Sequence, residues 1–419
     1  MPSQIVVIFT YRSPFGTVPE FVEDEIPFWG SAKKILIVSL AEHKEGHISL
    51  AANIDAYSVC PNISIIKRYW FLLFGLRHRW CLREFIACSI RNPKHLKNRL
   101  VSIAHHIQAV ERYYRGARCF LAKQEIKPDD TVVLYNYWCG PSTHASVQIK
   151  KTLPAQRVVI VTRAHGSDLY EHAHPSCYLP FRRYLLAACD HVFPISENGV
   201  RYSTTHWKCP PEKVSIAKLG IPDHFTGRFP KRDACFQVVS CSYVSPIKRV
   251  HLIAEALSAI SDIPVRWTHL GGGPGLEELR DVCARLFHGK GNLSFNLLGD
   301  LKHEDVIRAY RSENFNVLVN ASVSEGIPVS MMEAHCCGIP VIGPRVGGIE
   351  EIITPGMNGK LLPHDFSVDD LKNEIISIAR MESSQYAELC FSTRQSWQDR
   401  FSASRNYPQF ISSIEKLCA

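Results

Sequence analysis

The chain has 419 residues and a net charge of +8, with 46% hydrophobic and 21% charged residues. Its length exceeds what one hydrophobic core usually supports, so two domains are expected, and its composition excludes disordered and collagen-like classes. Its longest strongly apolar run, residues 69–76, is far shorter than the roughly 20 residues needed to span a bilayer, which argues against a transmembrane protein.

Short aliphatic runs alternate with helical stretches in two rounds. We expect strands of the first round at residues 5–10, 35–39, 132–135, 158–162 and 192–196. Those of the second round are expected at residues 237–242, 265–270, 294–297, 317–319 and 341–343. This alternation predicts an α/β protein with two Rossmann-like, doubly wound domains. Such domains bind ligands at the carboxyl ends of their strands, so a site is expected in a cleft between them.

A basic segment lies within the first round. Residues 61–120 carry twelve lysines and arginines against two acids, an excess of ten positive charges, and they include Tyr69, Trp70, Phe71, Phe74 and Trp80. This pattern is typical of a surface that lies on an anionic membrane. A core helix with snorkelling basic side chains is the plainer alternative, and RNA binding is a third. No RNA-reading motif accompanies the charge, so nucleic acid is not the expected partner.

The fifteen cysteines indicate the cellular compartment. Their spacing is irregular, no Cys-x-x-Cys pair occurs, and Cys336 and Cys337 are adjacent. These features favour reduced thiols in the cytoplasm. With the basic segment, they predict a cytoplasmic protein that lies peripherally on the inner face of the plasma membrane.

His165 and Asp168 follow the strand expected at residues 158–162. The end of a strand in a doubly wound domain is the edge where ligands bind. A lone histidine is more often structural than catalytic, but its place beside Gly166 and Asp168 favours a functional role. A stretch rich in proline, glycine and charge at residues 220–233 then separates the two rounds. It predicts a first domain at 1–219 and a second at 220–396.

Two further features belong to the second domain. The glycine run 271–275 follows a strand, but Leu276 replaces the last glycine of a dinucleotide fingerprint and Pro274 interrupts the turn. We therefore expect this loop to bring backbone close to a nucleotide rather than to bind NAD. Lys248 precedes a helix and is a candidate for the cation that meets a diphosphate. The chain has neither an Asp-x-Asp pair nor a His/Cys cluster with metal-ligand spacing, so no metal is expected.

The most informative stretch contains Glu325 and Glu333, eight positions apart. It predicts a strand at 317–319, a loop, and a helix that starts at Pro328 and ends at Gly338. Backbone amides at the helix start favour a diphosphate or a sugar hydroxyl. Glu333 lies roughly 7–8 Å further along the helix, so the two carboxylates can bind two parts of one elongated ligand, such as a sugar nucleotide. Solvated glutamates are the alternative, but the apolar neighbours of Glu333 predict a buried carboxylate.

This stretch resembles the Glu-x7-Glu signature of retaining glycosyltransferases of family 4, which have the two-domain GT-B fold. Further segments occur in the order of that family: residues 163–168, 245–250, 270–275, 295–299, 346–351 and 356–359. The resemblance covers nearly the whole chain, strongly from about residue 130 and weakly between 40 and 125. Position 242 is serine where the family usually has arginine.

The resemblance implies a retaining transferase that moves a hexose from a nucleotide sugar, expected to be UDP-linked, to a lipid-linked or saccharide acceptor. With the basic segment, it suggests a role in cell-surface polysaccharide or lipopolysaccharide synthesis. It also implies that the C-terminal helix 397–419 crosses back to the first domain. A sugar-nucleotide 2-epimerase is one alternative, and a non-catalytic sugar-nucleotide-binding protein, which Ser242 keeps open, is another.

The resemblance also assigns residue roles. The catalytic residues would be His165, Glu325 and Lys248. The donor would be bound by Gly16, Arg249, Leu298, Gly299, Gly326, Ile327, Pro328 and Glu333. Asp168 would position the acceptor, and no metal or other cofactor would take part.

Overall fold

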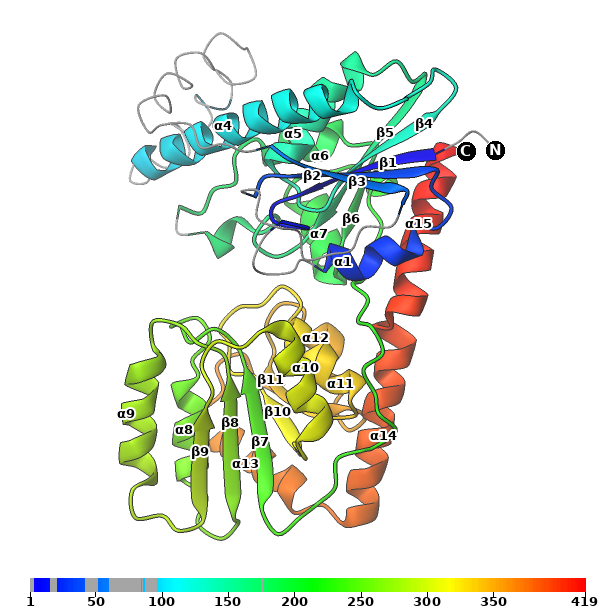
Figure 1. The fold of residues 1–419 in the computed structure, drawn as a ribbon. Helices are drawn as coiled ribbons and strands as arrows, with labels where there is room; N and C mark the ends of the chain where they lie inside the picture. Colours follow the sequence, from blue (N-terminus) through cyan, green and yellow to red (C-terminus); the bar gives the residue numbers. More distant parts are fainter. Residues whose placement is uncertain are drawn as a thin grey trace. The chain divides into compact units, whose positions relative to one another are not determined.

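The computed structural model describes residues 4–15, 21–41, 52–59, 84, 86, 96–174 and 176–419. The chain divides into two compact units (Figure 1). Unit 1 comprises residues 1–219 and 407–419, and unit 2 comprises residues 220–406. The chain therefore leaves unit 1 at the start of the proline- and glycine-rich stretch, and its last residues return to unit 1.

Unit 1 is built on a six-stranded parallel sheet with the order β3-β2-β1-β4-β5-β6. Its strands are β1 (Gln4–Thr10), β2 (Lys34–Ser39), β3 (Ile54–Ser58), β4 (Thr131–Asn136), β5 (Arg157–Ala164) and β6 (His191–Pro194). Its helices are α1 (Val22–Glu25), α4 (Leu96–Leu121), α5 (Pro141–Ile149), α6 (Arg182–Ala188) and α7 (Glu197–Thr205), with short 3-10 turns η1 (Ile26–Phe28), η3 (Lys150–Thr152), η4 (Glu171–Ala173) and η5 (Pro211–Lys213).

The two faces of this sheet belong to two cores. Alternate side chains of a strand point to opposite faces. Ile5, Val7 and Phe9 of β1 pack with α4 and α5, whereas Val6 and Ile8 pack in a second core. That second core contains Trp29 and the chain's last helix, α15 (Ala403–Cys418). Burial on both faces explains why the central strands are continuous aliphatic runs in the sequence.

A fully buried ion pair crosses the second core. Arg163 Nη2 lies 3.0 Å from Glu25 Oε2, and neither side chain is exposed. Arg163 Nε donates to the Tyr135 hydroxyl at 2.9 Å, and its guanidinium lies 4.0 Å from the ring centre of Phe410. Burial raises the pKa of the Glu25 carboxyl, although the Arg163 charge opposes this shift. Arg163 thus ties together α1, β4, β5 and α15.

Unit 2 has a second six-stranded parallel sheet, with the order β12-β11-β10-β7-β8-β9. Its strands are β7 (Phe236–Cys241), β8 (Val265–Leu270), β9 (Leu293–Leu297), β10 (Val317–Val319), β11 (Val341–Pro344) and β12 (Gly359–Leu362). Its helices are α8 (His251–Ser258), α9 (Leu276–Phe287), α10 (His303–Ser312), α11 (Val329–Cys336), α12 (Ile349–Ile352), α13 (Val368–Ala379) and α14 (Ser383–Arg400). Helix α8 packs against α9 and α13, and α11 packs against α10 and α14.

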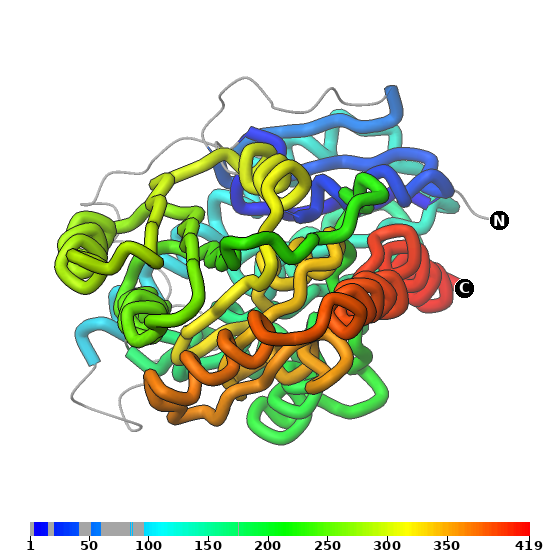
Figure 2. The backbone as a smooth tube through the Cα atoms, turned by 90° about the horizontal axis from the view of Figure 1, so that it is seen from below, coloured from blue at the N-terminus to red at the C-terminus, as the bar shows by residue number. Residues whose placement is uncertain are grey.

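The end of the chain, orange to red in Figure 2, differs from the single helix expected at 397–419. Helix α14 ends at Arg400, and α15 begins at Ala403. Ile221 explains the break: its amide donates to the Phe401 carbonyl at 2.7 Å, and its own carbonyl accepts from the Ala403 amide at 3.0 Å. The helix is therefore interrupted where the stretch that begins unit 2 pairs with it.

The predicted α/β class with two doubly wound sheets is confirmed. In each sheet the strand order reverses between two neighbouring strands, β1 and β4 in unit 1 and β7 and β10 in unit 2. In doubly wound folds, ligands bind beyond the carboxyl ends of the strands at this switch point. Among the described residues, no helix is both long and apolar enough to cross a membrane.

Candidate active site

A lysine and a glutamate meet at the switch point of unit 2. Lys248 follows β7, Glu325 follows β10, and Lys248 Nζ lies 2.6 Å from Glu325 Oε1. The Lys248 side chain is 25% exposed and that of Glu325 is 10% exposed, so water can reach the cation more easily than the carboxylate. The structure thus brings together two of the three predicted catalytic residues.

The carboxylate of Glu325 is held by its own loop as well. Asn320 Nδ2 donates to Glu325 Oε1 at 3.1 Å, and the Ser322 hydroxyl donates to the same oxygen at 2.7 Å. The predicted donor-binding residues Gly326, Ile327 and Pro328 continue this loop into α11, for which Pro328 is the N-cap. Helix α11 ends at Cys336, and Gly338, with a φ of +72°, follows its C-cap Cys337, so the helix closes near Gly338 as the sequence predicted. Three donors on one oxygen fix the carboxylate before any ligand arrives.

Two glycines, Gly347 and Gly348, pack closely against the backbone of the loop that carries Glu325. A side chain at Gly347, where φ is +50°, would place its Cβ 1.9 Å from the Glu325 carbonyl oxygen. Gly348 donates its amide to the Gly326 carbonyl at 2.7 Å. Any larger residue at 347 would push the Glu325 loop away, so glycine is required here by space as well as by conformation.

Glu333 lies in α11 and is 4% exposed, which confirms the predicted burial. Its carboxylate Oε1 lies 2.6 Å from Nε2 of His303, the first residue of α10. A buried carboxylate needs such a polar partner. His303 itself is partly exposed, so this pair reaches from the core of unit 2 to its surface.

Arg249 was predicted to meet the diphosphate with Lys248. In the structure its Nε donates to the Ala321 carbonyl at 2.8 Å, and its guanidinium lies 4.8 Å from the ring centre of Phe366. Arg249 thereby holds the β10 loop that carries Glu325, and its contact with a diphosphate stays a prediction.

The glycine loop 271–275 packs closely against neighbouring backbone. A Cβ at Gly271 would lie 2.1 Å from the Ser242 carbonyl oxygen, and the Val244 amide donates to the Gly272 carbonyl at 2.7 Å. Gly271 also donates to the carbonyl of Gly299, one of the two residues predicted to meet the nucleotide base, at 3.0 Å. The other, Leu298, is 42% exposed. Close backbone packing therefore explains why glycine occupies these positions. Contact of the loop with a nucleotide stays a prediction.

In unit 1, His165 and Asp168 lie together beyond β5. Asp168 accepts the His165 amide at 2.5 Å and the Cys139 amide at 2.8 Å, so each carboxylate oxygen has a backbone donor. The His165 ring is buried, with its centre 4.2 Å from that of Trp138. Gly16 and most of the basic segment 61–120 lie outside the described residues, so the predictions made for them stay predictions.

Several residues at these sites were missed by the sequence reasoning. His303, Asn320 and Ser322 contact the two glutamates. No motif spacing marks His303, which lies 30 positions before Glu333. Asn320 and Ser322 could have been found as polar residues directly after a strand that ends at the switch point. No group of three or more potential metal ligands occurs among the residues that the structure describes, and the metal-free site stays a prediction.

Comparison with solved structures identifies the fold. The Anabaena protein Alr3699/HepE in complex with UDP and glucose matches with a TM-score of 0.64 at 14% identity, covering 98% of this chain and 99% of that one. The sucrose-phosphate synthase of Thermosynechococcus elongatus matches with a TM-score of 0.69 at 15% identity, covering 99% of both chains. These likenesses, together with the two parallel sheets, show the GT-B fold.

Sequence comparison shows the family. Residues 236–380 match the family described as Glycosyl transferases group 1. A Methanocaldococcus jannaschii protein named as a glycosyltransferase, MJ1178, is 35% identical over 302 residues, which cover 71% of this chain and 77% of that protein. The Salmonella typhimurium protein named for colanic acid biosynthesis, WcaL, is 26% identical over 246 residues, 54% of this chain and 56% of its own length. The match to its Escherichia coli namesake spans 65% of that protein. The chain belongs to this glycosyltransferase family.

Proposed function

We propose that the chain is a retaining glycosyltransferase that moves a hexose from a nucleotide sugar to an acceptor hydroxyl. The observation that carries the proposal is the Lys248–Glu325 pair at the switch point of unit 2, 2.6 Å apart. A fixed ammonium there stabilises the charge that grows on a departing phosphate. Lys248 has three N–H groups, so it can donate to a phosphate oxygen and still hold Glu325.

The other residues of unit 2 are assigned by their places around this pair. Glu333, buried and fixed by His303, receives the ribose hydroxyls. The backbone near Leu298 and Gly299 meets the base, expected to be uracil, and Leu298 is exposed. Glu325 and the loop 326–328 meet the sugar. With these assignments, one elongated ligand lies beyond the carboxyl ends of the strands of the second sheet, near its switch point.

The proposed reaction needs no protein nucleophile. The bond between the anomeric carbon and the β-phosphate oxygen breaks, and the acceptor oxygen bonds to the same face of that carbon. The acceptor's proton passes to the departing phosphate oxygen, so charge and atoms balance. Lys248 stabilises the phosphate while it carries the most charge. Configuration at the anomeric carbon is thereby retained, and no divalent metal is required.

The names of relatives support a role in surface polysaccharide synthesis. WcaL is named for colanic acid biosynthesis, and a 24% identical relative from Erwinia amylovora, AmsK, is named for amylovoran biosynthesis. We propose that this chain likewise extends a cell-surface polysaccharide or a lipopolysaccharide, with a saccharide or lipid-linked acceptor.

The basic segment 61–120 supports cytoplasmic docking on an anionic membrane, where each lysine or arginine is worth about 1 kcal/mol. Co-sedimentation with vesicles tests this. Binding to anionic but not neutral vesicles, weakened by 1 M salt and by Arg77→Glu with Arg79→Glu, would support it. Equal binding to both kinds of vesicle would overturn it.

The function is tested by incubating the protein with UDP-sugars, with and without saccharide acceptors, and with and without a chelator. Release of UDP only with an acceptor, and at the same rate in EDTA, supports the metal-free transferase. An isomerised sugar nucleotide without acceptor would identify a 2-epimerase, and binding without turnover would identify a non-catalytic protein. A rate abolished by EDTA and restored by magnesium or manganese would contradict the metal-free site.

A further inference from the structure

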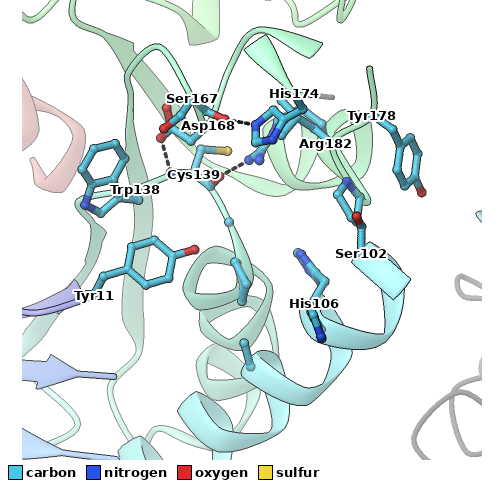
Figure 3. Close-up of a pocket in the computed structure, with 16 residues that line it drawn as sticks. Tyr11, Ser102, His106, Trp138, Cys139, Ser167, Asp168, His174, Tyr178 and Arg182 are labelled. Carbon is cyan, nitrogen blue, oxygen red and sulfur yellow. Dashed lines mark hydrogen bonds between the residues drawn. The ribbon is translucent and has the colours of Figure 1, made fainter. Parts of the chain in front are cut away.

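Unit 1 has a pocket at its own switch point (Figure 3). The pocket has a volume of about 420 Å³, within the range of small-molecule sites. Tyr11 reaches it from the end of β1, Trp138 from the end of β4, and Asp168 from the loop after β5. Helices α4 and α6 complete its wall with His106 and Arg182. The position is therefore equivalent to that of the Lys248–Glu325 pair in unit 2.

One side of the pocket is aromatic. The rings of Tyr11 and Trp138 have centres 6.3 Å apart, and Tyr11 is 37% exposed. Figure 3 shows both rings on one side, with His174 and Arg182 on the opposite side. Aromatic rings beside polar groups suit a ligand with an apolar ring face and hydroxyl edges, which is the character of a pyranose.

The opposite side contains a buried cation. Arg182 is 4% exposed, and its Nη1 donates to the Cys139 carbonyl. Its Nε is buried and has no hydrogen-bond partner, and no carboxylate forms an ion pair with it among the described residues. A buried charge is normally paired, because an unpaired one is costly to desolvate. Arg182 therefore lacks an anion that a ligand can supply.

Two neighbouring features favour the same kind of ligand. Helix α5 begins at Pro141, which lines the pocket, so the positive end of its dipole lies there. Arg99 of α4 is also buried, and its Nε and Nη2 each lie 3.3 Å from the Ser176 carbonyl oxygen. A carbonyl satisfies a donor without neutralising its charge, so Arg99 is a second buried cation on this side of unit 1 whose hydrogen-bond partners are carbonyls.

The other titratable groups near the pocket are two carboxylates and a pair of histidines. Asp168 directs its two carboxylate oxygens to the amides of His165 and Cys139. Glu84 accepts from the Tyr178 hydroxyl at 2.6 Å and from the Phe181 amide at 3.0 Å. Both carboxylates are therefore engaged by other donors, and neither forms an ion pair with Arg182. Burial and the nearby His144 and Arg182 lower the pKa of His106 well below its usual value, so that ring is neutral. His106 Nε2 lies 3.3 Å from His144 Nδ1.

We propose that this pocket binds an acceptor whose sugar ring carries an anionic oxygen group, a phosphate or a carboxylate. The ring lies against Trp138 and Tyr11, and the anionic group meets Arg182 and the start of α5. This inference rests on the proposed transferase function, and it makes the acceptor an acidic or phosphorylated saccharide. A phosphate could come from a lipid-linked sugar, and a carboxylate from a uronic acid.

The test is calorimetry with four probes: glucose 1-phosphate, glucuronate, methyl α-glucoside and inorganic phosphate. Every titration is made with UDP in excess, so that the donor site is occupied. We expect at least one of the two anionic sugars to bind about tenfold or more tightly than the neutral glucoside, and inorganic phosphate to bind more weakly than that sugar. The tighter anionic sugar identifies the source of the charge. A glucoside that binds as tightly as both anionic sugars would overturn the proposal.

Arg182→Gln provides the second arm, with Arg183→Gln as its control because Arg183 is the exposed neighbour on the same helix. We expect Arg182→Gln to lose about tenfold or more in affinity for the preferred anionic sugar, and Arg183→Gln to retain it. Equal affinities in the two variants would overturn the proposal. If Arg182→Gln does not fold, the proposal is still tested by whether the unaltered protein prefers an anionic sugar to methyl α-glucoside. UDP affinity of the unaltered protein is measured separately and reports on unit 2. If the unaltered protein does not bind UDP, the proposed function fails. If it binds UDP but does not prefer an anionic sugar, only the acceptor proposal fails.

Discussion

The ammonium of Lys248 lies 2.6 Å from a carboxylate oxygen of Glu325, and this contact joins the loops that follow β7 and β10. These are the two strands between which the order of the second sheet reverses. The residues are 77 positions apart in the chain, so only the topology brings them together. Under the proposed function, the cation fixed at this switch point meets the phosphate of the donor, and the carboxylate meets its sugar.

Lys248→Ala should lower kcat far more than it raises the KM for the sugar nucleotide. The charge on the leaving phosphate grows toward the transition state, so losing the ammonium should cost roughly 10²-fold in turnover. Steady-state kinetics with the preferred UDP-sugar measures this, and Lys231→Ala, an exposed lysine of the same unit, is the control. Equal effects on kcat and KM would mean that Lys248 only binds the ground state.

Gly347→Ala should displace the Glu325 loop and lower turnover. The added Cβ would lie 1.9 Å from the Glu325 carbonyl oxygen, a distance that forces the backbone to move. Gly356→Ala is a matched control, because Gly356 also has a positive φ, +80°, but has open space around its Cβ position. Both variants incur backbone strain, and only the first moves the loop. Similar turnover in the two variants would show that the loop tolerates the displacement.

Glu333→Ala should weaken UDP binding by about 1–3 kcal/mol, because the hydrogen bonds to the ribose are lost. Isothermal titration calorimetry measures the change, with the exposed Glu313→Ala as the control. Turnover at saturating donor should fall less than affinity does. If UDP binds Glu333→Ala as tightly as it binds the unaltered protein, the ribose assignment is wrong.

The sequence predicted ten of the twelve described strands and missed β3 and β12. The predicted strands are mainly continuous aliphatic runs, as expected for strands covered on both faces. β3 and β12 lie at the outer edges of the two sheets. All five residues of β3 are only partly buried, and β12 has four residues and begins with a glycine. Edge strands bury less surface, so their sequences carry a weaker pattern.

Within the site, the sequence predicted the properties of single residues better than their partners. The apolar neighbours of Glu333 predicted that it is buried, and the structure agrees. Its partner His303 was missed, because pairing across helices α10 and α11 depends on tertiary packing that no local spacing encodes. The break between α14 and α15 was missed for the same reason, since it depends on Ile221, which is far away in the sequence.

Two buried histidines should make the stability of unit 2 depend on pH. Burial lowers the pKa of His269 to about 4 and that of His335 to about 3, from an ordinary value of 6.5. Both are neutral in the folded protein at pH 5, whereas in the unfolded chain they bind protons below about pH 6.5. Unfolding therefore takes up protons, and the free energy of unfolding should fall as the pH drops from 6.5 toward 4. Each pKa unit of difference is worth about 1.4 kcal/mol.

Urea denaturation at pH 7.5, 6 and 5 measures this dependence, and His335→Leu isolates one contribution. His335 is fully buried in α11, so leucine removes the titrating group from an apolar position. We expect this variant to lose less stability between pH 7.5 and pH 5 than the unaltered protein, whatever its stability at pH 7.5. His288→Gln is the control, because His288 is exposed at the end of α9 and should leave the slope unchanged. If His335→Leu keeps the full pH slope, burial of the neutral imidazole is not what makes the protein sensitive to acid.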